Sequence, residues 1–200
     1  MTHKALQIIR AEHGALSAML HALRALCPKE GVSPTAADFE LMRAILFYID
    51  EFPERLHHTK ESELLFPMVR RRAPESAAML DRLDAEHARG ESAIRDLQHD
   101  LLAWEQMGTP RRDRFASELK RYADFYAGHL QLEETAVLPL AARVLDADDW
   151  SLLDAAFELN RDPLTGHEPS DEYRSLFTRI LNLAPAPIGL GDARPRQAPR

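Results

Sequence analysis

Two stretches of the sequence repeat one arrangement of residues that can bind a metal. Each has a histidine, a glutamate four residues later and a proline ten residues after the histidine, and each follows a helix-length segment that contains Ala-Glu-His. The six residues of this repeat are His13, His57, Glu61, His87, His129 and Glu133. Imidazole and carboxylate are ligands of iron, manganese and zinc, and six of them exceed the four that a tetrahedral zinc site takes. The repeat therefore predicts two metal ions that share the glutamates.

Helix geometry predicts that these side chains meet. Residues four apart lie on one face of an α-helix, so His57 and Glu61 share a face, as do His129 and Glu133. Each face continues through apolar residues, which marks it as the side turned to the core. Buried carboxylates and imidazoles are costly without partners, and a polyvalent cation removes that cost. We therefore expect the metal site inside a helical bundle.

Apolar residues recur at helical spacing along four stretches, and residues 1–160 show no β-type alternation. The first stretch covers Leu6 to Leu23, and the others run from about Thr35 to Arg72, from Pro74 to Gly108 and from Pro110 to Leu145. A kink is expected at Pro53. Short connections favour antiparallel neighbours. The predicted fold is all-α, an up-down-up-down four-helix bundle with additional short C-terminal helices.

We expect three parts along the chain. Residues 1–146 form the bundle, residues 147–183 form a helical extension packed on it, and residues 184–200 are a mostly irregular or disordered tail. In the extension, one helix starts near Asp148 and ends near Asn160, and a second starts near Ser170.

Composition excludes several classes of protein. The 200 residues carry a formal net charge of −7, which argues against nucleic-acid binding. The single cysteine, Cys27, excludes a disulfide scaffold and a cysteine-based metal site within one chain, and it is predicted to have no role. No segment resembles a signal peptide or a membrane span, so a cytoplasmic location is expected.

Four further residues are candidates for outer or extra ligands: Glu91, Glu134, Tyr122 and Tyr126. Glu91 lies one turn after His87 and is either a seventh ligand or an edge residue. The tyrosines precede His129 on its face, and they either pack in the core with hydrogen-bonded hydroxyls or donate a proton or electron near the metals. His58 lies about 100° around the helix from the ligand face and is expected on the flank. The other histidines are expected at the surface or hydrogen-bonded: His3, His21, His99 and His167.

Four segments carry a family resemblance: Glu12-His13, His57-His58-Thr59-Lys60-Glu61 with Leu65-Phe66-Pro67, Glu86-His87, and His129-Leu-Gln-Leu-Glu133-Glu134 with Leu138-Pro139. Over about residues 3–145 the sequence resembles the hemerythrin-like (HHE cation-binding) family. The resemblance implies a non-haem di-iron centre bridged by two carboxylates and an oxo or hydroxo group. Glu91 stands where oxygen-carrying hemerythrins have a fifth histidine. Their last ligand is a carboxylate five residues after the histidine of the fourth helix; the repeat favours Glu133 at four residues, and Glu134 lies at five. The four-histidine, two-glutamate set is similar to the di-iron repair proteins and iron-sensing domains of this family.

The expected function is to bind or reduce dioxygen, peroxide or nitric oxide at two iron ions. Two alternatives stay open, a non-enzymatic iron or oxygen sensor and an iron-donating repair protein. In a sensor, residues 149–183 would present a surface to a partner. The sequence indicates no particular protein partner and leaves open whether the chain is an enzyme.

Overall fold

The computed structural model describes residues 3–27 and 34–184, and in these residues all regular secondary structure is helical. The first bundle helix is α1 (Lys4–Leu26). The second continues from Ala36 to Arg72 through five segments: α2 (Ala36–Ile49), η1 (Asp50–His57), α3 (His58–Lys60), η2 (Glu61–Leu65) and α4 (Phe66–Arg72).

The third and fourth bundle helices each begin with a short 3₁₀ turn. The third consists of η3 (Pro74–Ser76) and α5 (Ala77–Met107), and the fourth of η4 (Thr109–Arg111), α6 (Arg112–Leu132), η5 (Glu133–Val137) and α7 (Leu138–Val144). The chain then forms α8 (Ala147–Glu158), the turn η6 (Pro163–Thr165) and α9 (Arg174–Leu183). Most of the predicted irregular tail, residues 185–200, lies outside the described residues.

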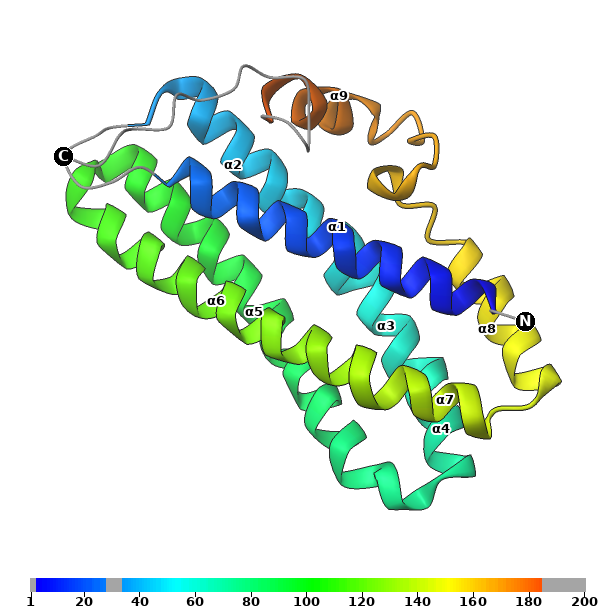
Figure 1. Ribbon diagram of the computed structural model, residues 1–200. Helices are drawn as coiled ribbons and strands as arrows, with labels where there is room; N and C mark the ends of the chain where they lie inside the picture. Colours follow the sequence, from blue (N-terminus) through cyan, green and yellow to red (C-terminus); the bar gives the residue numbers. More distant parts are fainter. Residues whose placement is uncertain (1–2, 28–33, 185–200) are drawn as a thin grey trace, which may run out of the picture.

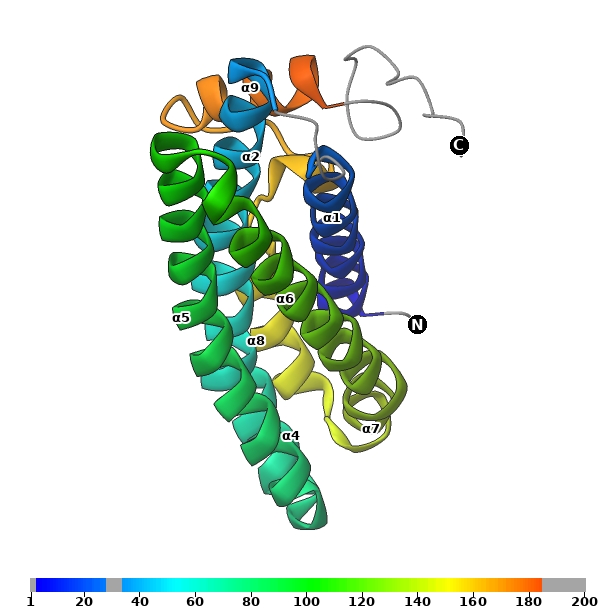
Figure 2. The ribbon, with the colours of Figure 1, turned by 90° about the vertical axis from the view of Figure 1, so that its left-hand side faces the viewer.

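The long helices lie side by side and alternate in direction along the chain (Figures 1 and 2). α1 contacts α2 and α6, and α5 contacts the same two helices. Local signals in the sequence set the helix ends. Thr35 and Asp38 form a capping box at the start of α2, and Gly108, with a φ of 78°, ends α5. The all-α class and the bundle are confirmed.

Two apolar clusters fill the bundle, and a layer of polar residues lies between them. Along α1, Ile9 belongs to one cluster and Leu16 to the other. Glu12 and His13 lie between these two residues, and both are at most 5% exposed. The polar layer is therefore enclosed by core on both sides, which makes every unpaired polar atom in it costly.

Widened π-helical turns occur at η1, η2 and η5. A proline has no N–H, and its ring collides with the carbonyl four residues earlier, so the turn before it cannot keep regular α-helical bonding. The N–H of Phe66 bonds instead to the carbonyl of Glu61, and that of Leu138 to the carbonyl of Glu133. The prolines of the repeat thus place a π turn at each glutamate of the repeat. Pro53, where a kink is predicted, lies inside η1.

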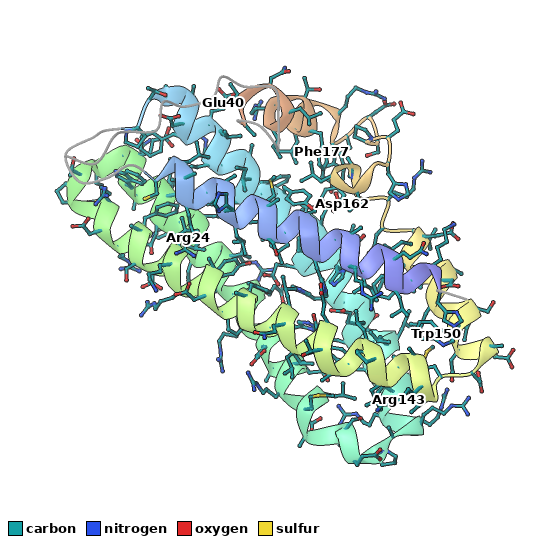
Figure 3. All side chains as sticks on the ribbon, in the orientation of Figure 1. Arg24, Glu40, Arg143, Trp150, Asp162 and Phe177 are labelled. Atoms are coloured by element: carbon teal, nitrogen blue, oxygen red, sulfur yellow. The ribbon has the colours of Figure 1, made fainter. Side chains whose placement is uncertain are left out.

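The segment after the bundle folds back along it. α8 contacts α1, and α9 contacts α2. At one end the ring of His3 stacks on Trp150, and at the other end Phe177 packs against Tyr48 and Phe52. Figure 3 labels Trp150 and Phe177 on these two helices. The division of the chain after residue 146 stays a prediction.

No helix in the described part of the chain combines the length and the apolar character that crossing a bilayer requires.

Candidate metal centre

In the first half of the bundle, the histidines and the glutamate of the repeat meet in the polar layer. His13 on α1 and His57 at the end of η1 face each other, with their Nε2 atoms 3.2 Å apart. Glu61 Oε2 lies 3.3 Å from His57 Nε2. All three side chains are at most 3% exposed. Two imidazole nitrogens and a carboxylate therefore converge on one point, away from water.

The second half repeats this arrangement. The Nε2 atoms of His87 on α5 and His129 on α6 lie 3.1 Å apart, and Glu133 Oε1 lies 3.3 Å from His129 Nε2. Two facing ring nitrogens cannot both present lone pairs to each other without a proton or a cation between them. The same constraint holds in both halves.

The glutamates connect the two halves. Glu61 Oε2 lies 3.5 Å from His87 Nε2, so this glutamate of the first half reaches a histidine of the second. Glu133 Oε2 lies 3.4 Å from His13 Nε2, which makes the opposite connection. Each carboxylate is within reach of both histidine pairs, as a ligand shared by two metal ions must be.

The helix-face argument predicts that His58 lies on the flank of its helix, and this prediction is wrong. His58 is 2% exposed, and its ring stacks on that of His87 with the ring centroids 4.3 Å apart. One ring nitrogen lies within 4.8 Å of a ring nitrogen of His87 and of His129. The reason is that η1, which leads directly to His58, contacts both α1 and α5. Two positions about 100° apart on such a helix both face the interior.

The five buried histidines are oriented in the same way. Each has a carboxylate or a hydroxyl close to its Nδ1, and the pairs are His13 with Glu134 (3.1 Å), His57 with Glu12 (2.7 Å), His58 with Glu54 (3.0 Å), His87 with Ser62 (2.8 Å) and His129 with Glu86 (2.9 Å). A ring that donates its Nδ1–H to such a partner keeps the Nε2 lone pair for a metal. Metal-binding histidines in proteins are almost always held in this way.

The cluster contains buried polar atoms that the protein leaves without hydrogen bonds. Both carboxylate oxygens of Glu61 and of Glu133 have no hydrogen-bond partner, and neither has His58 Nε2. Both glutamates are 0% exposed. An unsatisfied buried carboxylate is among the most costly features of a fold. The residues present therefore fit a polyvalent cation, which would take all five atoms.

The metal-free charge state follows from burial and from the neighbouring groups. Burial raises the pKa of Glu61, but the opposing charges of His57 and His87 outweigh it and hold this pKa at about 2. Burial lowers the pKa of His129, but Glu133 and Glu86 raise it to about 9. Glu61 and Glu12 likewise hold the pKa of His57 well above its usual value against the effect of burial. Without metal, the charges of these imidazolium rings therefore compensate those of the buried carboxylates, although the oxygens of Glu61 and Glu133 accept no hydrogen bond from them.

Burial, together with the charges on its histidine neighbours, keeps the pKa of His58 well below its usual value. Its ring is therefore neutral at physiological pH, which is the form that binds metals. Burial also lowers the pKa of His13. Each half of the cluster thus contains at least one imidazole that is ready to bind a cation without first losing a proton.

Tyr122 and Tyr126 act on Glu54. Both hydroxyls donate to Glu54 Oε1, at 2.5 Å each, while Glu54 Oε2 faces His58 Nδ1. Burial raises the pKa of Glu54, and the two hydrogen bonds counter this. Gly90 on α5 makes room for the group, because a Cβ there would lie 2.0 Å from the Tyr126 hydroxyl. The hydroxyls thus satisfy a buried carboxylate. This arrangement is the one expected if the tyrosines pack in the core with hydrogen-bonded hydroxyls.

Two glutamates that the sequence marks as extra candidates lie in different settings. Glu134 reaches His13 Nδ1, so it holds a histidine of the cluster from outside. Glu91 does not join the cluster, since its side chain is 48% exposed and forms an ion pair with Arg95. This position favours the interpretation of Glu91 as an edge residue. His58, the residue after His57, is instead the fifth histidine that lies in the buried cluster.

The histidines outside the repeat other than His58 lie away from the centre. His21, His99 and His167 are exposed, and His3 stacks on Trp150. Cys27 is a free cysteine at the end of α1, and burial raises the pKa of its thiol. A thiol of this kind is a poor nucleophile.

Of the five partners that orient the histidines, the sequence marks only Glu134 as a candidate, and it does not single out the other four. Glu12 and Glu86 carry a usable signal, because each precedes a histidine of the repeat in Ala-Glu-His. Ser62 and Glu54 carry none, since nothing in their spacing distinguishes them from other polar helix residues. Contacts between helices decide their role.

Fold and site together define a class: a helical-bundle protein with a buried histidine–carboxylate cluster suited to binding metal. The sequence model of the hemerythrin HHE cation-binding domain matches residues 4–141, and the chain belongs to this family. The match runs from the start of α1 into α7 and includes every residue of the buried cluster. No curated protein matches the chain.

Proposed function

We propose that this protein holds two iron ions in the buried cluster and uses them to bind or reduce a small oxidant. His13 and His57 would bind one ion, and His58, His87 and His129 the other. Glu61 and Glu133 would be shared, because each lies within reach of histidines from both halves. Iron in such a centre supplies reversible ligand binding and electron transfer to dioxygen, peroxide or nitric oxide.

The observation that carries this proposal is the set of unpartnered carboxylate oxygens. Glu61 and Glu133 are fully buried, and none of their four oxygens has a hydrogen bond to satisfy it. Three of these oxygens, Glu61 Oε2 and both of Glu133, lie 3.3 to 3.6 Å from histidine nitrogens. Seven nitrogen and oxygen donors are too many for one tetrahedral zinc ion. Imidazole and carboxylate without thiolate suit iron, and the family match is to a cation-binding domain.

The protein around the centre limits what can reach it. Glu12, His13 and His57 border a small cavity of about 10 Å³, which Leu16 and Phe52 also line. Such a volume is close to the minimum that holds one water molecule. Beside Glu12 there is therefore room for about one molecule the size of water, and a larger molecule would enter from this side only if the surrounding side chains moved.

Metal analysis of the purified protein tests the ligand set. We expect about two metal ions per chain after anaerobic loading with iron(II), and a lower content in Glu61→Ala and Glu133→Ala. His99→Ala is the matched control, because His99 is exposed on α5, and it should keep the full content. Less than about one metal per chain in the wild type, or an unchanged content in His57→Ala, would refute the proposed centre.

Reaction with excess oxidant tests the function itself. An enzyme consumes many equivalents of peroxide or nitric oxide per iron pair, whereas a carrier or a sensor consumes one at most. A sensor has one structural observation in its favour: Asn160, which follows α8, donates a hydrogen bond to Glu12 beside the centre. An iron donor requires the enclosed cluster to open, so fast transfer of iron to a chelator would support that alternative instead.

A further inference from the structure

The segment between α8 and η6 enters the polar layer of the bundle. Asn160 is 5% exposed, and its Nδ2 donates to Glu12 Oε2 at 2.9 Å. The same oxygen lies 2.7 Å from Nδ1 of His57. The ammonium group of Lys60 in turn donates to Asn160 Oδ1. Asn160, which lies outside the four bundle helices, thus donates a hydrogen bond to Glu12, and Glu12 orients His57 of the centre.

The second half of the bundle shows why Asn160 is needed. There Glu86 plays the part of Glu12 and holds His129, and its other oxygen accepts a hydrogen bond from Arg82 at 2.8 Å. Arg82 lies four residues before Glu86 on the same helix. The residue four before Glu12 is Ile8, which has no donor. Helix α1 therefore cannot supply the second hydrogen bond, and Asn160 supplies it from the extension.

The backbone around Asn160 is held from both sides. Arg161 has a φ of 45°, a left-handed conformation that a non-glycine residue keeps only when its surroundings impose it. The next residue, Asp162, is 2% exposed and accepts hydrogen bonds from Tyr48 Oη at 2.6 Å and from the N–H of Leu164 at 2.9 Å. Figure 3 shows Asp162 on the segment that leads to α9. Asn160 and Asp162 also line the cavity beside His57.

We propose that Asn160 is a positioning residue for the first half of the metal centre. It holds the Glu12 carboxylate, which fixes the Nδ1–H of His57 and directs its Nε2 into the cluster. This inference rests on the proposed metal centre. It makes the extension part of the site, so metal binding and docking of the segment around Asn160 stabilise each other by linkage.

Anaerobic titration of the full chain with iron(II) tests the proposal, with Asn160→Ala and Arg82→Ala as a matched pair. Asn160→Ala should weaken one of the two binding steps about 10- to 100-fold and leave the other unchanged. Arg82→Ala should weaken the other step, and by less, since its side chain is 63% exposed. His167→Ala, an exposed residue of the extension, is the control without effect. If Asn160→Ala does not fold, Asn160→Leu removes the same donor, keeps about the size of the side chain and places no second carboxylate beside Glu12.

Hydrogen exchange separates positioning from a purely structural role. In the wild type, metal should slow exchange at residues 159–165, and Asn160→Ala should abolish this response. Two binding steps like those of the wild type in Asn160→Ala, or an equal loss in both steps, would overturn the inference and leave the metal centre standing. A wild-type protein that binds less than about one metal per chain would refute the proposed function itself.

Discussion

Gly90→Ala should destabilise the protein although it places a better helix former inside α5. The helix-propensity term alone favours alanine by about 1 kcal/mol. The new Cβ would lie 2.0 Å from the hydroxyl oxygen and 3.0 Å from Cζ of Tyr126, and 3.1 Å from Glu54 Oε1. The tyrosine ring must therefore move away, and its hydrogen bond to Glu54, 2.5 Å in the structure, is lost.

The size of the effect follows from these contacts. A hydrogen bond to a carboxylate contributes about 1.5 to 3 kcal/mol, and overpacking of a core costs about 1 to 3 kcal/mol more. After the gain of about 1 kcal/mol in helix propensity, we expect Gly90→Ala to lower the free energy of unfolding by about 1.5 to 5 kcal/mol. Since Glu54 also holds His58, the variant should bind metal more weakly as well.

Urea unfolding of metal-free and iron-loaded protein measures both effects. Gly14→Ala and Gly128→Ala are matched controls, because both glycines are helical and a Cβ at either position would meet nothing within 4 Å. These two variants should be as stable as the wild type or about 1 kcal/mol more stable. If Gly90→Ala behaves like them, the close contact between α5 and Tyr126 does not exist as described.

Three further results are expected. His58→Ala should reduce metal content, measured by elemental analysis, whereas a residue on the flank of the helix would leave it unchanged. Burial raises the pKa of Asp162 from 3.8 to about 6. Ionisation of Asp162 therefore lowers the stability of the fold as the pH rises from about 4 to about 6, by at most about 3 kcal/mol above pH 6, and has no effect below pH 4. Asp162→Asn should therefore raise the melting temperature at pH 7.5 and change it less at pH 4.5. Finally, a metal ion must displace protons from His57 and His129, because the pKa values of both are raised. Zinc binding at pH 7 should therefore release about two protons. Calorimetry in buffers of different ionisation enthalpy can count them.

The bundle and the ligand-bearing helices could be predicted because their signals are local. Helical periodicity, the capping residues Thr35 and Asp38 and the break at Gly108 each act within one element. The prolines after the glutamates were visible in the sequence as part of the repeat. Their effect, a π turn at Glu61 and at Glu133, depends on which carbonyl loses its partner, and periodicity does not show this.

The residues that the sequence did not reveal are those in which the two halves differ. When the second and fourth helices are aligned on the repeat, His58 corresponds to Leu130 and Glu54 to Tyr126. The mismatched residues interact, since Tyr126 donates to Glu54 and Glu54 holds His58. Searching for a repeat finds what the halves share and passes over these substitutions. Yet only these substitutions give the second half a third histidine.

The same asymmetry explains the place of the extension. The half that gains His58 satisfies its orienting carboxylate, Glu86, with Arg82 from its own helix. The other half has two histidines, and its orienting carboxylate, Glu12, depends on Asn160 from outside the bundle. Two binding positions with different donors and different support should differ in affinity. A titration that gives two equal steps in the wild type would therefore contradict the asymmetry of the centre, even if both metal ions bind.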